Sequence, residues 1–220
     1  MDKHAGRINL ARMTDDFSPA SFWDDRYDRS DYLFGTRPAG FVEQQAHRIP
    51  DGARVLAVAD GEGRNSVWLA KRGLDVTAMD NSQVGLGKAR ALAASEGVSV
   101  DFQLADILSY GWTADSYDVV LGVYFQFLSP DDRPAVFHGM NAALRPGGLL
   151  MIHGFAPRQV DYGTGGPGKI ENMYTLDLLH DAFPDYEVLH EADYDAHVDS
   201  GEGHNGTAAL IDFVARKPGA

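Results

Sequence analysis

Between residues 54 and 155 the chain alternates short apolar runs with longer segments in which apolar residues recur at helical spacing. The runs have the length of strands, and the segments between them have the length of helices. The pattern predicts strands at 54–59, 75–79, 99–104, 117–123 and 149–155. It predicts helices at 64–72 and 83–96, and a third that Ser129 caps and that runs to Leu144. Because alternating strands and helices are joined by right-handed crossovers, we expect a largely parallel sheet.

The pattern changes after residue 155. A glycine-rich loop at 161–168 precedes a short helix predicted at 176–183. Two long β-type runs, at 186–198 and 207–216, then flank a loop rich in glycine and histidine, which predicts a hairpin. The predicted fold class is therefore α/β, with a doubly wound sheet that ends in an antiparallel hairpin.

The residues ahead of the first strand have a different character. Residues 1–20 show no sustained periodicity and are expected to form a flexible N-terminal arm. Residues 21–50 combine aromatic and charged side chains and end in an amphipathic helix predicted at 41–49. Since no low-complexity linker interrupts the chain, residues 21–220 are expected to form one domain, with a lid at 21–50, a core at 54–155 and a final part at 156–220.

Composition narrows the classes of function. The 220 residues include no cysteine, which excludes disulfides, thiolate metal sites and cysteine nucleophiles. A formal net charge of −13 disfavours binding to nucleic acid or to an anionic membrane surface. The first ten residues lack the apolar core of a signal peptide, so a cytoplasmic location is expected. The oligomeric state is left open.

The turn after the first predicted strand carries the clearest chemical signal. It contains Gly61 and Gly63, and the next predicted strand leads into Asp80. Glycines allow the backbone to approach a ligand where a Cβ atom would clash. A carboxylate at the end of the second strand can accept hydrogen bonds from two ribose hydroxyls. This unit therefore predicts a nucleoside site.

Several segments resemble the class I S-adenosylmethionine-dependent methyltransferases, in particular the small bacterial group near the tellurite-resistance and thiopurine methyltransferases. They are the turn at 59–65, the second strand and following helix at 76–89, and the Leu-Arg-Pro-Gly-Gly turn at 144–148. The aromatic segment ahead of Pro38 is similar to that group's cofactor lid. The resemblance implies a Rossmann-like, mostly parallel seven-stranded sheet. It also implies methyl transfer from S-adenosylmethionine, by in-line displacement, to a small-molecule acceptor that the sequence does not identify.

The resemblance also implies a set of cofactor-binding residues. Asp80 would accept hydrogen bonds from the ribose, and Asp106 would accept one from the adenine amino group beside the Ile107 amide. Trp23 and Tyr27 would close the site and exclude water. The full expected set is Trp23, Tyr27, Gly35, Ala59, Asp60, Gly61, Gly63, Asn65, Asp80, Asn81, Ser82, Asp106, Ile107 and Val123.

Two positions depart from the pattern of the family. It usually has an acidic residue at the position of Ala57 and a glycine at the position of Ala59. Asp60 could replace the electrostatic contribution of the missing carboxylate. Because of these departures, one alternative function is that of a non-catalytic protein that binds S-adenosylmethionine. A nicotinamide-dinucleotide oxidoreductase is a further alternative, although Ser66 stands where a dinucleotide fingerprint needs its third glycine.

The catalytic residues are not identified by the sequence. The candidates near the acceptor are Tyr124, Gln126, His153 and His204, with His197 as a further polar neighbour. His197 and His204 also raise the possibility of a metal site. Because no close histidine spacing accompanies them, no metal is expected.

Overall fold

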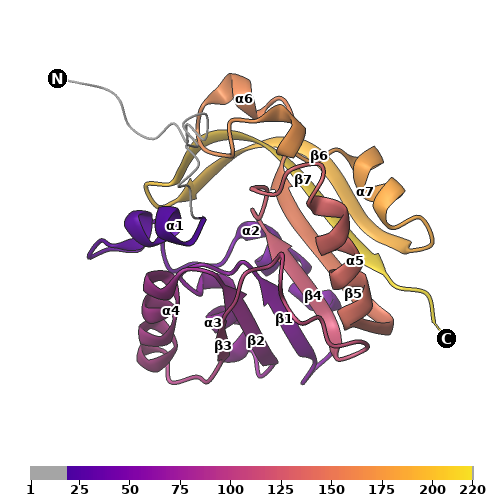
Figure 1. The fold of residues 1–220 in the computed structure, drawn as a ribbon, viewed down its shortest axis with the longest axis horizontal. Coiled ribbons are helices and arrows are strands. Elements are labelled where there is room, and N and C mark those ends of the chain that lie inside the picture. The colour runs from indigo at the N-terminus through magenta and orange to yellow at the C-terminus, as the bar shows by residue number, and fades with distance from the viewer. Residues whose placement is uncertain (1–18, 220) are drawn as a thin grey trace.

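The computed structural model describes residues 19–219. A seven-stranded sheet forms its centre, with the strand order β3-β2-β1-β4-β5-β7-β6 (Figure 1). The strands are β1 (Arg54–Val58), β2 (Asp75–Asp80), β3 (Asp101–Leu104), β4 (Tyr117–Val123), β5 (Leu144–Phe155), β6 (Glu187–Ser200) and β7 (His204–Arg216). The α-helices are α1 (Pro19–Tyr27), α2 (Gly40–Gln45), α3 (Arg64–Lys71), α4 (Gln83–Ser95), α5 (Arg133–Ala143), α6 (Gln159–Tyr162) and α7 (Leu176–Ala182). Short 3-10 helices follow α2 at Ala46–Arg48 and precede α7 at Ile170–Asn172.

The pairing of the strands confirms the predicted sheet. β1 pairs in parallel with β2 and β4, β2 with β3, and β4 with β5. β7 then runs antiparallel to β5, and β6 antiparallel to β7. The strand order reverses between β1 and β4, and such a reversal opens a crevice at the carboxyl ends of the strands.

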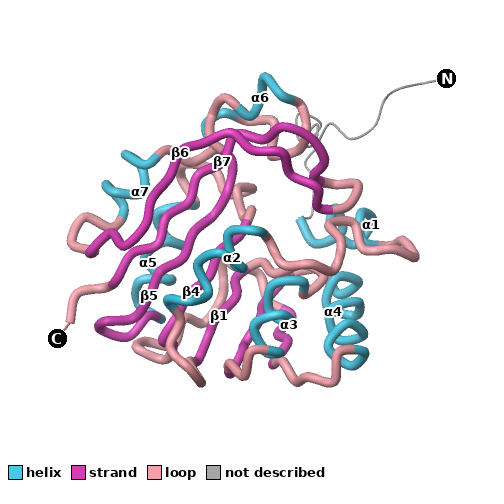
Figure 2. Tube along the Cα trace, turned by 180° about the vertical axis from the view of Figure 1, so that it is seen from behind, coloured by secondary structure: helices cyan, strands magenta, loops and turns pink. Residues whose placement is uncertain are grey.

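The two faces of the sheet are covered by different helices (Figure 2). Side chains of successive residues in a strand point to opposite faces, so β1 contributes Val55 to one apolar cluster and Leu56 to another. The first cluster includes apolar residues of α2 and α3, and the second includes those of α5 and α7. Both faces are therefore buried, which explains why the central strands are apolar almost throughout.

Several predicted boundaries differ from the structure. β5 begins at Leu144 and β3 at Asp101, whereas the predicted strands begin at residues 149 and 99. The helix expected after Ser129 begins at Arg133, after a turn in which Ser129 Oγ accepts from the Asp132 N–H at 3.2 Å and donates to Asp132 Oδ2 at 2.7 Å. The hairpin strands extend to Ser200 and from His204, so the loop between them is much shorter than predicted. The predicted flexible arm lies outside the described residues except at its end, where residues 19 and 20 belong to α1.

A single antiparallel register places two polar residues opposite each other in the sheet. His153 of β5 pairs with Asp212 of β7, and both side chains are buried. Directly paired residues share one face of the sheet, so these side chains meet.

Within residues 19–219, no helix has both the length and the apolar character needed to cross a bilayer.

Candidate functional site

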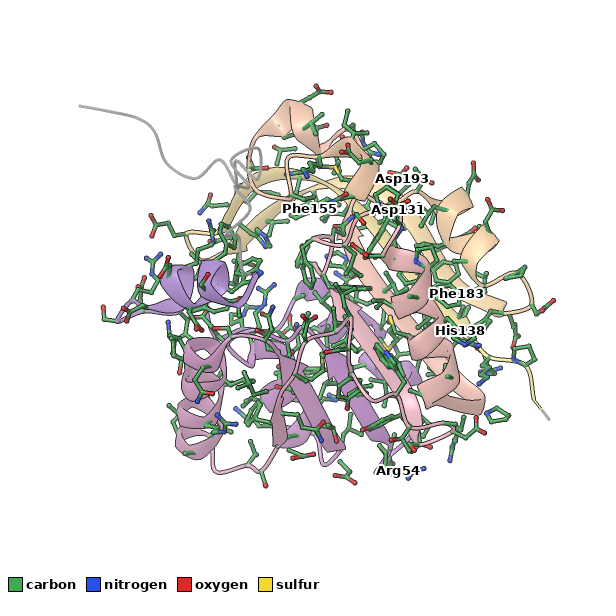
Figure 3. The ribbon with its side chains drawn as sticks, in the orientation of Figure 1. Arg54, Asp131, His138, Phe155, Phe183 and Asp193 are labelled. Carbon is green, nitrogen blue, oxygen red and sulfur yellow. The ribbon has the colours of Figure 1, made fainter. Side chains whose placement is uncertain are left out.

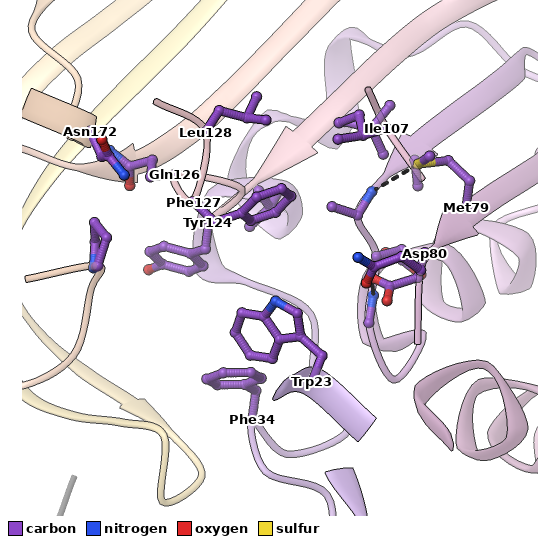
Figure 4. A pocket seen from close by; sticks show the side chains of 18 of the residues that line it. Trp23, Phe34, Met79, Asp80, Ile107, Tyr124, Gln126, Phe127, Leu128 and Asn172 are labelled. Atoms are coloured by element: carbon purple, nitrogen blue, oxygen red, sulfur yellow. Dashed lines mark hydrogen bonds between the residues drawn. The ribbon is translucent and has the colours of Figure 1, made fainter. Parts of the chain in front are cut away.

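A cavity of about 350 Å³ lies at the carboxyl ends of β1, β2 and β4, beneath α1. Figure 3 shows the two ends of the sheet, with Arg54 at the start of β1 and Phe155 at the end of β5 where the cavity opens. The residues around it fall into two groups (Figure 4). Met79, Asp80 and Ile107 lie on one side, and Trp23, Phe34 and Tyr124 lie on the other. The volume is typical of a pocket for a small molecule.

Asp80 ends β2 with a carboxylate that the backbone holds in place. Its Oδ2 accepts a hydrogen bond from the Gly61 N–H at 2.8 Å, and its Oδ1 accepts one from the Ser82 N–H at 2.9 Å. Each carboxylate oxygen retains a second acceptor position. Burial raises the pKa of Asp80 to about 6, partly offset by these backbone donors. The carboxylate is therefore ionised at neutral pH and can accept from a pair of hydroxyls.

The turn after β1 holds a second carboxylate, that of Asp60. Ser66 Oγ donates to Asp60 Oδ2, and the part of Asp60 that stays exposed lies in the cavity wall. Burial raises the pKa of Asp60 to about 7. The neighbouring Ala59 has φ 50°, a left-handed conformation that costs about 1–2 kcal/mol for a residue with a Cβ atom. The chain thus keeps the bend at Ala59 without the glycine that the resemblance implies at this position.

The two glycines of the turn have different roles. Gly61 lines the cavity, and a Cβ atom built on it would lie 2.6 Å from the hydroxyl of Tyr27. Gly63 does not line the cavity and instead caps α3, where a Cβ atom would lie 2.7 Å from the Cβ of Ala89. The expectation that Gly63 provides space for a ligand is therefore not supported by its position. It allows α3 and α4 to approach each other.

The aromatic segment forms a wall over the cavity, as the predicted lid requires. Trp23 stacks on Tyr27 with ring centroids 5.4 Å apart, and Phe34 lies 6.5 Å from both rings. Asp24 fixes α1 to the start of α4, because it accepts hydrogen bonds from Ser82 Oγ at 2.6 Å and from the Val84 N–H at 3.0 Å. Ser82 lies behind the cavity wall and caps α4 by accepting from the Gly85 N–H.

The loop after β3 supplies the remaining predicted contacts. Asp106 and Ile107 both line the cavity, and Ile107 is buried. Asp106 is exposed, and its Oδ1 accepts from the Leu108 N–H at 2.9 Å. This bond is a turn contact, and it leaves Asp106 with a free oxygen for a donor on a ligand.

A polar group lies at the other end of the cavity. The guanidinium of Arg64 donates to the Phe34 carbonyl at 3.1 Å and lies 5.9 Å from the ring of Tyr124. His204 packs against Tyr124 with ring centroids 4.5 Å apart. Burial lowers the pKa of His204 well below its ordinary value, so its ring is neutral at pH 7. Its buried Nδ1 has no partner among the described residues.

The catalytic candidates Gln126, His153 and His197 differ in how they lie relative to the cavity. The side-chain amide of Gln126 donates to the Phe155 carbonyl at 2.8 Å and accepts from the Phe155 N–H at 2.5 Å. His153 lies behind Tyr124 and does not line the cavity. His197 is exposed on β6, away from the cavity, so the suggested grouping with His204 is wrong.

Most of the predicted site residues meet around this one cavity. Those that line it are Trp23, Tyr27, Gly35, Ala59, Asp60, Gly61, Asn65, Asp80, Asn81, Asp106, Ile107, Val123, Tyr124, Gln126 and His204. The cavity-lining residues missed in the sequence include Phe34, Arg64, Met79, Phe127, Lys169 and Asn172. Arg64 could have been found, since it belongs to the glycine turn that carries the resemblance. Met79 belongs to β2 and directly precedes Asp80, whereas the remaining residues come from loops and a short 3-10 helix whose positions depend on long-range packing.

The sequence of this chain is similar to a known protein family and to several known proteins. Residues 55–148 match a protein family described as "Methyltransferase domain". "Hemagglutinin 1" of Eikenella corrodens is 28% identical over 169 residues, which are 76% of this chain and 55% of that protein. "Probable S-adenosyl-L-methionine-dependent methyltransferase TehB" of Haemophilus influenzae is 28% identical over 108 residues, which are 49% of this chain and 37% of that protein. The chain thus spans about a third to a half of the length of these relatives.

Solved structures share the fold over most of the chain. The crystal structure of TehB from Haemophilus influenzae has a TM-score of 0.67 at 21% sequence identity, and covers 90% of this chain and 66% of its own. A structure from work on "Conversion of a Disulfide Bond into a Thioacetal Group during Echinomycin Biosynthesis" has a TM-score of 0.71 at 21% identity. It covers 90% of this chain and 91% of its own. The predicted Rossmann-like fold is confirmed.

Proposed function

Since this chain carries a methyltransferase domain and is related to the TehB-like group of class I S-adenosylmethionine-dependent methyltransferases, we propose that it transfers a methyl group to a small-molecule acceptor. S-adenosylmethionine is the cofactor of this family. The printed name of TehB gives no acceptor, so we infer the acceptor class from the residues of the cavity.

The observation that carries this proposal is the position of Asp80. Its buried carboxylate ends β2 at the cavity wall and keeps acceptor capacity beside Gly61, whose N–H it holds at 2.8 Å. A buried carboxylate with unused acceptor positions favours a ligand with paired donors, such as the two hydroxyls of a ribose. The residues present therefore fit an adenosine moiety.

The remaining wall residues would have three tasks. Ile107 would contact the adenine, and Asp106 would accept from its amino group. Asp60 and the backbone at Gly61 would lie beside the amino-acid part of the cofactor. Trp23 and Tyr27 would cover the bound molecule and exclude water. These roles are those the resemblance implies, and the cavity brings the side chains together.

The bound cofactor would supply an electrophilic methyl group on a sulfonium, so the main work of this chain is alignment. Holding the acceptor in line behind the methyl group can lower the barrier by about 7–11 kcal/mol in the best intramolecular cases. The half of the cavity near Tyr124 and Phe34 is available for the acceptor, since it lies opposite Asp80 (Figure 4). His204 packs against both of these rings.

A calorimetric titration with S-adenosylhomocysteine, the product of the cofactor, tests the proposal. We expect saturable binding with a dissociation constant below about 1 mM, and no comparable binding of NADH. Absence of S-adenosylhomocysteine binding would reject the proposal. Tight binding without turnover across a broad panel of acceptors would instead favour a non-catalytic binding protein.

A further inference from the structure

Three polar side chains form a hydrogen-bonded chain that reaches the acceptor half of the cavity. His153 Nδ1 lies 2.7 Å from Asp212 Oδ1, and His153 Nε2 lies 2.9 Å from the hydroxyl of Tyr124. His153 and Asp212 are buried within the sheet, whereas Tyr124 lines the cavity. These hydrogen bonds therefore connect the hydroxyl of a cavity-lining tyrosine to a buried carboxylate through one imidazole.

The chemistry of the three groups fixes the direction of the hydrogen bonds. A carboxylate only accepts, so His153 Nδ1 carries the proton that bonds to Asp212. In the neutral imidazole Nε2 then lacks a proton and accepts from the hydroxyl of Tyr124. The tyrosine oxygen, which donates this hydrogen bond, keeps lone pairs that can accept a proton. This is the arrangement of a hydroxyl, a histidine and a carboxylate in which the histidine takes the hydroxyl proton.

Asp212 has two further neighbours that hold it in place. His190 Nε2 lies 3.4 Å from its Oδ2, and the Tyr194 hydroxyl donates to its Oδ1 at 3.3 Å. On the other side of His153, Phe41 stacks parallel to the imidazole with ring centroids 5.0 Å apart. The imidazole is thus fixed in both position and orientation.

The backbone at Tyr124 is also in an unusual conformation. Its φ is 56°, which a non-glycine residue adopts at a cost of about 1–2 kcal/mol. Its N–H donates to the His153 carbonyl at 2.9 Å, which holds the strained bend beside the imidazole. Strain of this kind persists only where the surroundings enforce it, and it is concentrated at functional sites.

We propose that Tyr124, acting through His153 and Asp212, is the general base of this enzyme and that the acceptor is a phenol. The proposal rests on the methyltransferase function proposed above. A phenol carries a proton that must leave as the methyl group arrives, and its ring suits a cavity wall that includes Phe34, Phe127 and Phe155.

A bond forms between the phenol oxygen and the methyl carbon, while the methyl–sulfur bond breaks and its electron pair stays on sulfur. The phenol proton passes to Tyr124 Oη as the proton of Tyr124 passes to His153 Nε2. The imidazolium formed beside Asp212 then returns its proton to Tyr124, which releases one proton to water.

The guanidinium of Arg64 supports the negative charge that develops during this step. It lies 5.9 Å from the centroid of the Tyr124 ring. Burial raises the pKa of Tyr124, and the positive charge of Arg64 acts in the opposite direction. Tyr124 therefore stays neutral at rest, and its oxygen gains partial negative charge only while its own proton moves to His153 and the phenol proton arrives.

The test measures kcat of the wild type and of Tyr124→Phe with two acceptors that differ in acidity. Phenol keeps its proton at about pH 8, whereas 4-nitrophenol is largely ionised and needs no base. We expect Tyr124→Phe to lower kcat for phenol by at least about tenfold more than for 4-nitrophenol. The control Tyr162→Phe removes an exposed hydroxyl bonded to Asp195 and should leave both rates unchanged. Equal loss for both acceptors, or no methylation of either phenol by the wild-type chain, would overturn the proposal.

A second readout needs no turnover and separates this proposal from the methyltransferase function. In the complex with S-adenosylhomocysteine, ¹⁵N NMR of His153 should report a protonated Nδ1 and an unprotonated Nε2. Tyr124→Phe should shift the Nε2 resonance and leave the binding of S-adenosylhomocysteine within about twofold. The opposite tautomer would overturn the relay even if the cofactor product binds. Loss of binding in the wild-type chain would instead reject the function on which the relay rests.

Discussion

The carboxylate of Asp80 bonds to the backbone N–H of Gly61 at 2.8 Å and so joins the end of β2 to the turn after β1. β1 and β2 are neighbours in the sheet, and β1 is one of the two strands between which the strand order reverses. The hydrogen bond from Gly61 orients the carboxylate at the wall of the cavity. It links the glycine turn and the acidic strand end that the sequence singled out.

Replacement of Asp80 tests its proposed role toward the ribose. We expect Asp80→Ala to weaken the binding of S-adenosylhomocysteine by about 1–3 kcal/mol, because buried hydroxyls would lose their acceptor. Calorimetry gives the dissociation constant. Asp101→Ala, on the exposed start of β3, is the matched control and should bind as the wild type does. An unchanged constant in Asp80→Ala would remove this residue from the site.

Substitution of Gly63 tests the close approach of α3 and α4. Gly63→Ala adds a Cβ atom 2.7 Å from that of Ala89 and also strains a φ of 86°. Gly73→Ala is the control, because φ there is 83° and no atom lies within 4 Å of the added Cβ. We expect Gly63→Ala to lower the free energy of unfolding by about 1–3 kcal/mol more than Gly73→Ala does. Equal losses in denaturant unfolding would show that backbone strain alone explains the effect.

The raised pKa of Asp60 predicts a dependence of stability on pH. Burial raises this pKa from 3.8 to about 7, so the folded state favours the protonated carboxyl. The stabilisation is fully present below pH 3.8 and is lost as the pH rises through about 7. Asp60→Asn imitates the neutral form and keeps an acceptor for Ser66. We therefore expect its advantage in melting temperature over the wild type to grow between pH 5 and about pH 8. A constant difference across that range would contradict the raised pKa.

The lid can be followed through tryptophan fluorescence. The chain has three tryptophans. Trp23 lines the cavity, whereas the ring of Trp68, a residue of α3, packs against the guanidinium of Arg72 and does not line the cavity. Binding of S-adenosylhomocysteine should change the emission of Trp23 because the ligand would replace solvent beside its ring. We expect Trp23→Phe to abolish most of this change and Trp68→Phe to retain it. If Trp68→Phe abolished the change and Trp23→Phe retained it, Trp23 would not lie beside the ligand.

The local pattern of the sequence was sufficient for much of the fold. The apolar run before Gly61 and the strand that ends at Asp80 are close in sequence, so their pairing and their meeting at one sheet edge could be predicted. The start of α5 was harder to predict. Ser129 makes the expected capping contact, since its Oγ accepts from the Asp132 N–H at 3.2 Å, but a turn at 130–132 separates it from the helix, which begins at Arg133. The local signal identified the capping residue and not the turn that follows it.

The acceptor half of the cavity was harder to predict for a different reason. Tyr124, His153 and Asp212 lie far apart in the chain and meet only through the order β4-β5-β7 and the register of β7 on β5. A shift of one residue in that register would send Asp212 to the opposite face. Sequence reasoning named Tyr124 and His153 as polar candidates but gave no means of pairing them with Asp212.

A crystal structure with S-adenosylhomocysteine tests the central claim most directly. We predict that both ribose hydroxyls lie within about 3.2 Å of the Asp80 carboxylate and that the adenine lies against Ile107. An adenosine bound outside this cavity, or a ribose with no contact to Asp80, would contradict the account.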